Sequence, residues 1–600
     1  MKSVWTVCAI LFLATALVGQ TSTATKPKKA AAATLTAADV QALKDAIASQ
    51  QAALAQQQQQ LQELREELHR KDQTVQQAQT AASDATSKAD AAQAQAAQQQ
   101  EAVTALKSDV TDLKSGMANT VMTLQETQKN VSDSPAALHF KGITITPGGF
   151  LAAEMVRRSR ALGSDINTPF NSLTMPGASA SSLSEFFGSG RQSRVSMLAE
   201  GRLKSAKLTG YVEADFLSAG VTSNNNQSNS YTLRQRQVWG QAAFDNGWSF
   251  TGGQMWSLVT ETKKGVDNRT EALPMTIDPQ YHVGFSWARQ YGLRVVKNFN
   301  NKAWFAVSME NPQATLTTHG NGANFLVGSA GTGGGLYNLN ANYSFNPSPD
   351  IIAKAVFEPG FGHYEIFGVY SRFRDRVFPC GEASATFPCG PAAANTTPNA
   401  SGAFNSSKNG GGFGANARWS FANKRIDFGL HGFGGSGVGR YGTSGLADVS
   451  VRSDGTLALV KSLQGLATLE WHAPKIDVYF NTGAEYASRT AGYDPLTNKY
   501  VGYGAPQFAN SGCFAETVPG AGGFLPGGLA NCTADTRVVI EGTAGFWYKL
   551  YDGSKEKVNR GRVTWGPQFS YVDRNTWSGV GGEPHGLDAM VFTSFRYYLP

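Results

Sequence analysis

Arginines recur at alternate positions in several segments where apolar and polar residues also alternate. In residues 191–203, Arg194, Glu200 and Arg202 share one side of the alternation, and Arg294 holds the same place in residues 289–297. A period of two predicts strands with one apolar and one polar face. The planar guanidinium fork suits carboxylates and keeps its charge, so these polar faces are candidate anion-binding surfaces.

The densest arginine pattern lies in residues 363–376. If its apolar side chains Phe367, Val369 and Phe373 point outward, the opposite face holds Tyr370, Arg372, Arg374 and Arg376. Arg234 and Arg236 share their parity with Val238, Ala242 and Phe244, which suggests an outward or subunit-interface position. Acidic residues on polar faces could oppose the arginines and create a transverse field. These are Glu200, Glu213, Asp215 and Glu310. Alternatively, each arginine pairs with a wall carboxylate such as Glu213 or Asp215, or contacts lipopolysaccharide phosphate.

Signals for catalysis are poor. The glycine string of residues 432–437 matches G-x-G-x-x-G, but no helix pattern follows it to bind a phosphate. The eight histidines form no His-Glu-x-x-His pair, and no Gly-x-Ser-x-Gly elbow is present. The sequence therefore predicts no enzyme, cofactor, metal site or nucleic-acid partner.

Four cysteines form two close pairs in Gly-, Pro- and Asn-rich sequence, Cys380 with Cys389 and Cys513 with Cys532. An exported chain meets an oxidising compartment, so two loop disulfides are predicted. Metal binding is the weaker alternative, because neither pair has Cys-x-x-Cys spacing.

The alternating segments that carry the arginines are predicted to be strands of a membrane barrel. Residues 586–600 alternate to the end of the chain, with Leu587, Val591, Phe595 and Tyr597 on one face, as in the lipid-facing wall of such a barrel. Beyond residue 138, seven short turns alternate with eight long loops, which predicts about 16 antiparallel strands. Only a closed barrel lets a chain without long apolar runs cross a bilayer.

The N-terminal part has a different organisation. Residues 1–24 are typical of a signal peptide and residues 25–38 of a linker. A heptad register then runs without a slip from Val40 to Val131, so residues 39–134 are predicted to be a coiled coil of a homo-oligomer. A rod of this length would measure about 140 Å. Between Ala78 and Gln100 the core positions shrink to Ala and Gln, which leaves a disordered spacer as the alternative.

The whole chain has a formal charge of +7, and the barrel segment 139–600 holds 40 basic against 32 acidic residues. A basic excess in a pore favours anions. The order signal, coiled coil and barrel resembles the DcaP-like trimeric outer-membrane porins. The matching segments are Arg191-Gln-Ser-Arg194, Leu233–Gly240, Gly253–Ser257, Arg289-Gln290 with Arg294, Glu310–Pro312 and Pro349–Ile351. The resemblance implies a homotrimer in the outer membrane of a diderm bacterium, passing small anionic solutes through an arginine-lined constriction.

The resulting hypothesis is a passive porin steered by Arg194, Arg202, Arg294, Arg372 and Arg374, with the coiled coil in the periplasm and outer-membrane lipid and lipopolysaccharide around the wall. Residues 259–282 or 312–349 could fold inward and narrow the lumen. The alternative is an envelope tether, in which the coiled coil reaches peptidoglycan and the barrel is mainly an anchor.

Overall fold

A computed structural model describes two units, within residues 1–115 and 116–600. The described residues of the second unit are 137–218, 231–317, 325–326, 345–381, 399–495, 498–507, 510–518, 532–554, 556 and 559–600. In the first unit they are the helical residues 100, 104, 106–111 and 114. There Thr104 and Thr111 donate hydrogen bonds to the carbonyls of Gln100 and Lys107, four residues earlier. This agrees with a helix at that place, but the rest of the predicted coiled coil, the signal peptide and the linker lie outside the described residues.

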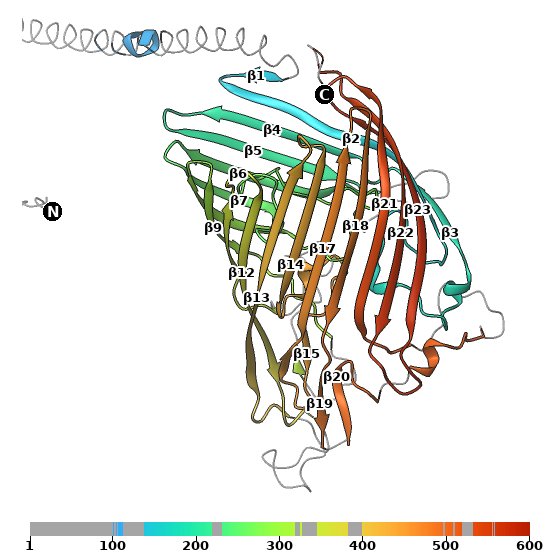
Figure 1. Cartoon of the computed structure of the whole chain (residues 1–600). Helices are drawn as coiled ribbons and strands as arrows, with labels where there is room; N and C mark the ends of the chain where they lie inside the picture. The colour runs from blue at the N-terminus through green and yellow to red at the C-terminus, as the bar shows by residue number, and fades with distance from the viewer. Residues whose placement is uncertain are drawn as a thin grey trace, which may run out of the picture. The chain divides into compact units, whose positions relative to one another are not determined.

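The second unit is a closed antiparallel barrel (Figure 1). Within the described residues its sheet has 19 strands, of which three are short additions and the others form the ring. The ring strands are β2 (Ile143–Arg158), β4 (Arg194–Arg202), β5 (Ala206–Asp215), β6 (Arg234–Phe244), β7 (Trp248–Trp256), β8 (Arg289–Phe299), β9 (Ala303–Glu310), β11 (Asp350–Phe357), β12 (His363–Val377), β13 (Phe404–Phe421), β14 (Ile426–Ser436), β17 (Lys461–His472), β18 (Ile476–Ala487), β21 (Thr536–Asp552), β22 (Arg562–Thr576) and β23 (His585–Tyr598). The predicted number of about 16 strands is confirmed.

The first and last ring strands close the barrel. Phe150–Arg158 of β2 pairs with β23 on one side. On the other side, β2 pairs first with β4 and then, from Glu154 onward, with the short strand β3 (Glu185–Ser189). The other short strands of the sheet are β1 (Leu138–Phe140) and β10 (Phe325–Leu326).

Outside the ring, the described parts of the long loops contain two hairpins and four short helical turns. They are β15 (Val449–Val451) with β16 (Leu457–Leu459), β19 (Thr490–Asp494) with β20 (Lys499–Tyr503), and the 3₁₀ turns η1 (Phe170–Ser172), η2 (Ser179–Ser182), η4 (Gly439–Tyr441) and η5 (Ser511–Cys513). The short connections all lie at the opposite end of the barrel. The β8–β9 turn, for example, reverses through Asn300 and Asn301, which both adopt φ 55°. Asparagine tolerates this left-handed conformation, which a type I′ turn requires at both of its central positions.

The alternation seen in the sequence becomes two faces of the wall. Val195 and Met197 of β4 are exposed on the outside, whereas Leu198 is buried inside with Tyr211 and Trp239. The strand period of two separates the faces. Within the described residues, no helix is long and apolar enough to span a bilayer.

Candidate functional site

The connection between β7 and β8, residues 257–288, lies across the inside of the barrel. Near its two ends, glutamates of distant strands accept its backbone N–H groups. These bonds run from Leu258 to Glu310 (2.8 Å), Thr262 to Glu365 (2.9 Å), Val283 to Glu541 (2.9 Å) and Gly284 to Glu485 (2.8 Å). The acceptors belong to β9, β12, β21 and β18, so the loop is fixed to the wall around much of the ring. The structure thus places residues 259–282 inside the barrel, as one of the two predictions had it. Of residues 312–349, the other candidate, residues 318–324 and 327–344 lie outside the described residues.

A compact arginine and carboxylate cluster lies on the inner face of β4, β5 and β6. Arg236 contacts Glu213 through Nε at 2.7 Å and Asp215 through Nη1 at 2.7 Å. Arg234 reaches the other side of Asp215 at 2.9 Å, and Arg194 lies 3.6 Å from Glu213. The side chain of Arg236 is only 1% exposed, so the two carboxylates neutralise a charge that water does not reach.

A β-bulge explains why Arg234 and Arg236 point inward, which corrects the prediction from their parity with Val238. Gln237 pairs with Glu213 but Gln235 pairs with Ala214, which leaves Arg236 as an extra residue on β6. One extra residue shifts the alternation along the strand. Arg236 and Gln237 are therefore both buried inside although they are adjacent in sequence.

Next to this cluster is a cavity of about 560 Å³ between the loop and the wall. Four cations and two carboxylates line it. They are Arg194, Lys549, Arg562 and Arg596, with Asp278 of the loop and Asp477 of β18. The lining also includes the aromatic rings of Phe150, Tyr281, Trp547 and Tyr598. The charged lining is thus predominantly positive.

Arg596 of β23 connects wall, cavity and loop. Its Nη2 donates to Glu154 at 2.7 Å, to Gln192 at 2.9 Å and to the loop carbonyl of Ile277 at 3.3 Å. Its guanidinium also lies 4.6 Å from the ring centroid of Trp547. Arg562 and Arg596 were not among the predicted site residues. The signal was present, because assigning Phe595 and Tyr597 to the lipid side places Arg596 on the other side.

Other predicted site residues of this half lie inside or at the mouth, but not all line the cavity. Arg202 pairs with Asp245 at 2.8 Å and is 63% exposed near the short turns, where Glu200 pairs with Lys207. Arg294 is buried and donates to Asn268 of the loop at 2.8 Å. It therefore holds the loop rather than facing the cavity.

The prediction that Tyr370, Arg372 and Arg374 line the lumen is wrong. Phe367 and Val369 pack inside against Val259 of the loop, and Phe373 packs against Phe345 and Val449. Tyr370 and Arg372 consequently lie on the exposed outer face, Tyr370 with 45% of its surface accessible, and Arg374 shares their parity. The physical reason is that inward-folded loops provide apolar surface inside the barrel, so here apolar side chains point to the lumen.

One group of side chains near the short-turn end of the cavity has metal-ligating chemistry. Ligand atoms of Asp427, Glu470 and His472 lie within 4.8 Å of one another. His472 Nδ1 lies 3.0 Å from Asp477, and its Nε2 lies 3.3 Å from Glu470. The sequence predicted no metal site, because these residues come from different strands and follow no metal motif.

Burial changes the protonation of three loop groups. Desolvation raises the pKa of Asp278 and of Glu271 to about 7, and it lowers the pKa of His282 to about 4. Asp278 Oδ1 accepts the N–H of Gln280 at 2.8 Å and that of Thr168 at 3.4 Å. The loop therefore contains groups whose charge depends on whether it remains closed against the wall.

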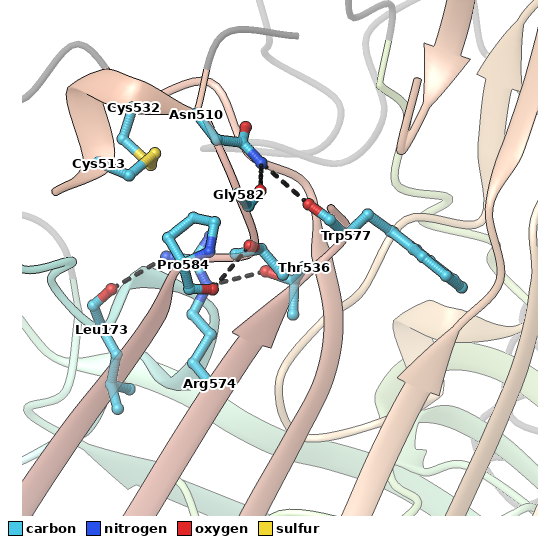
Figure 2. The surroundings of a disulfide bond; sticks show 10 residues. Leu173, Asn510, Cys513, Cys532, Thr536, Arg574, Trp577, Gly582 and Pro584 are labelled. Atoms are coloured by element: carbon cyan, nitrogen blue, oxygen red, sulfur yellow. Dashed lines mark hydrogen bonds between the residues drawn. A yellow bond between two sulfur atoms is a disulfide. The ribbon is translucent and has the colours of Figure 1, made fainter. Parts of the chain in front are cut away.

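The predicted disulfide between Cys513 and Cys532 is present, with Cα atoms 4.4 Å apart. Figure 2 shows it beside Asn510, whose amide donates to the carbonyls of Trp577 and Gly582 at 3.0 and 2.9 Å. The bridge joins two parts of the β18–β21 loop, and the Asn510 hydrogen bonds hold this loop next to the β22–β23 connection. Cys380 is also disulfide-bonded, and its predicted partner Cys389 lies outside the described residues.

A closed ring of sixteen antiparallel strands is the fold of outer-membrane β-barrels, and here the third long loop folds inward. The barrel is similar to the outer membrane channel DcaP of Acinetobacter baumannii, with 13% identity, a TM-score of 0.51, and coverage of 76% of this chain and 98% of that chain. This likeness in fold agrees with the DcaP-like resemblance found in the sequence. OmpT, an outer membrane protein of Vibrio cholerae, gives 10% identity and a TM-score of 0.39 over 77% of this chain and 99% of its own. An anion-selective porin from Comamonas acidovorans gives 8% identity and a TM-score of 0.37 over 76% and 100%. No family model and no curated protein matches the sequence.

Proposed function

We propose that this protein is a DcaP-like porin through which small anionic solutes, above all carboxylates, diffuse passively across an outer membrane. The single observation that carries the proposal is the charged lining of the cavity beneath the inward loop, with four cations against two carboxylates. Fixed positive charge in a narrow pore raises the local concentration of anions.

The arginines of the cavity differ in what they can offer a solute. Arg596 is committed to Glu154 at 2.7 Å. Arg194 is held less closely, because its distance to Glu213 is 3.6 Å and its side chain is 20% exposed. It therefore keeps N–H donors that face the cavity. Arg562 also lines the cavity, with its guanidinium 4.6 Å from the ring centroid of Tyr598. Arg194 and Arg562 are the groups we assign to contact a passing carboxylate.

The proposal includes a homotrimer whose heptad segment, residues 39–134, forms a coiled coil in the periplasm after removal of residues 1–24. The support is the uninterrupted heptad register in the sequence. The short-turn end of the barrel then faces the periplasm and the long loops face outward. In this arrangement the coiled coil could also approach peptidoglycan, so a tethering role is compatible with the porin.

The test is the reversal potential of the purified full-length protein in a planar bilayer under a salt gradient. We expect anion selectivity that falls when Arg194 and Arg562 are both replaced by Gln. Replacing Arg202 with Gln is the matched control, because this exposed arginine pairs with Asp245 away from the cavity lining. Closed channels in folded wild-type protein, or equal selectivity in all three proteins, would contradict the proposal.

A further inference from the structure

The outward face of β12 changes character along its length. Outward positions begin with Tyr364, whose hydroxyl accepts a hydrogen bond from Trp419 of β13 at 2.9 Å. Ile366 follows at 58% exposure, and the neighbouring Phe413 of β13 is 83% exposed. Beyond them, Tyr370 leads into Arg372, Arg374 and Arg376, called here the outer arginine row. An aromatic and apolar surface thus ends in three arginines at alternate positions.

The spacing places this row at the edge of a membrane. Tyr364 and Arg372 are eight residues apart, which is about 26 Å along a strand at about 3.3 Å per residue. With a strand tilt of about 40°, this corresponds to a height of about 20 Å, and Arg376 lies at about 30 Å. The apolar band of an outer-membrane barrel is about 25 Å tall. If Tyr364 and Trp419 mark the lower interface, the row straddles the upper one.

On the β13 side, Arg372 and Arg376 face neutral side chains rather than carboxylates. Arg372, Arg374 and Arg376 pair with Asn409, Ser407 and Asn405. Arg376 donates to Asn405 at 3.0 Å, and within the described residues neither Arg372 nor Arg376 forms an ion pair. Asp375 lies between Arg374 and Arg376 in sequence, but its side chain is fully buried on the inner side of the wall. Like charges held at alternate positions in a strand repel one another, so an external anion is favoured beside them.

We propose that the outer arginine row binds the phosphate groups of a phosphorylated glycolipid of the lipid A type in the outer leaflet. Guanidinium forks bind phosphate oxygens in a bidentate manner, and the amides and hydroxyl of Asn405, Asn409 and Ser407 stand beside them for sugar hydroxyls. The inference rests on the membrane orientation in the proposed function, because the long-loop end must face outward. It assigns to these arginines a lipid contact, not a place in the pore.

The test compares lipid binding by full-length wild-type protein and a variant with Arg372→Gln and Arg376→Gln. Native mass spectrometry in detergent measures binding of bis-phosphorylated lipid A and of the same lipid after dephosphorylation. We expect wild type to bind the phosphorylated form at least tenfold more tightly and the variant to lose most of this preference. The matched control, Lys204→Gln with Lys302→Gln, removes two exposed charges at the short-turn end and should bind as wild type does.

Several results would overturn the inference. Equal lipid A binding by variant and wild type would show that the row makes no phosphate contact. Equal competition by phosphatidylglycerol would show a general anionic surface, and dissociation of the variant oligomer would show a contact between subunits. If the Gln variant does not fold, Arg372→Lys with Arg376→Lys keeps the charge, and weaker lipid binding by it tests the guanidinium fork. Conductance is recorded in parallel. A wild-type channel that stays closed but still binds lipid A would contradict the proposed porin function and leave the lipid contact standing.

Discussion

The arginines of β4 to β6 and those of β12 occupy opposite faces of the same wall. Arg236 is 1% exposed and bonded to two carboxylates, whereas Arg372 is exposed and faces Asn409. Both groups come from strands of alternating sequence, so the alternation alone does not decide which face is wet. What differs is the material inside the barrel, polar around Arg236 and apolar loop side chains behind Phe367 and Phe373.

The largest expected difference between the two regions is in stability. Replacing Arg236 with Gln leaves Glu213 and Asp215 buried with fewer compensating charges, and we expect a loss of about 3–5 kcal/mol in the free energy of unfolding. Urea titration of tryptophan fluorescence in lipid vesicles measures it. Arg372→Gln should change the same quantity by less than about 0.5 kcal/mol, as surface substitutions usually do. If both variants lost the same free energy of unfolding, the proposed difference between the buried and the exposed arginines would be wrong.

The second difference is in pH dependence, which should belong to the inner loop. Asp278 has an ordinary pKa of 3.8 that burial raises to about 7, so the closed loop holds this proton and the open loop releases it as pH rises. Closure therefore weakens between about pH 4 and 7 and stays weaker above pH 7. Each pKa unit corresponds to about 1.4 kcal/mol.

Asp278→Asn isolates this effect, because the amide oxygen can still accept the N–H groups of Thr168 and Gln280. Hydrogen exchange of residues 276–284, corrected for intrinsic rates, should be slower in the variant than in wild type at pH 8. At pH 4 the two proteins should exchange at the same rate. His282 contributes with the opposite sign, but it is present in both proteins, so its contribution drops out of the comparison. A difference that grows toward low pH would reverse the assigned sign.

The third difference is in ion selectivity, where a smaller effect is expected. Arg194→Gln should lower the anion-to-cation permeability ratio severalfold, because one of the four cavity cations is removed. Arg372→Gln should leave the ratio unchanged, since this side chain lies outside the lumen. Reversal potentials at low ionic strength, where screening is weak, measure both variants. If Arg372→Gln changed the permeability ratio more than Arg194→Gln did, the outer arginine row would have to line the pore.

The smallest expected effect on the channel itself comes from the disulfide loop, which lies apart from both arginine groups. Replacing Cys513 and Cys532 with Ser should lower stability by about 2–4 kcal/mol if the reduced loop is fully free in the unfolded chain. Because the loop also keeps the Asn510 hydrogen bonds, we expect the lower end of this range, with conductance unchanged. Thermal unfolding of the oxidised variant and of oxidised wild type measures the difference, because reducing wild type would also break the disulfide of Cys380.

The barrel could be predicted because each part of its signal is local. Strand faces follow from alternation in segments such as β4 and β23, and the strand number follows from turn and loop lengths. The Cys513–Cys532 bridge followed from proximity in sequence and an exported chain. The cavity could be predicted only in part. Arg194 was found from its parity, whereas Arg562 and Arg596 come from the far end of the chain and meet it through barrel closure.

The sequence by itself determined the antiparallel barrel, its strand number and the predominance of arginine on polar strand faces, because these depend on neighbours along one strand. Tertiary structure decided which way those faces point. A single extra residue on β6 turned Arg236 inward, and loops packed inside the barrel turned Phe373 inward and Arg372 outward. Both decisions depend on contacts between segments that are distant in sequence, where a period of two carries no information.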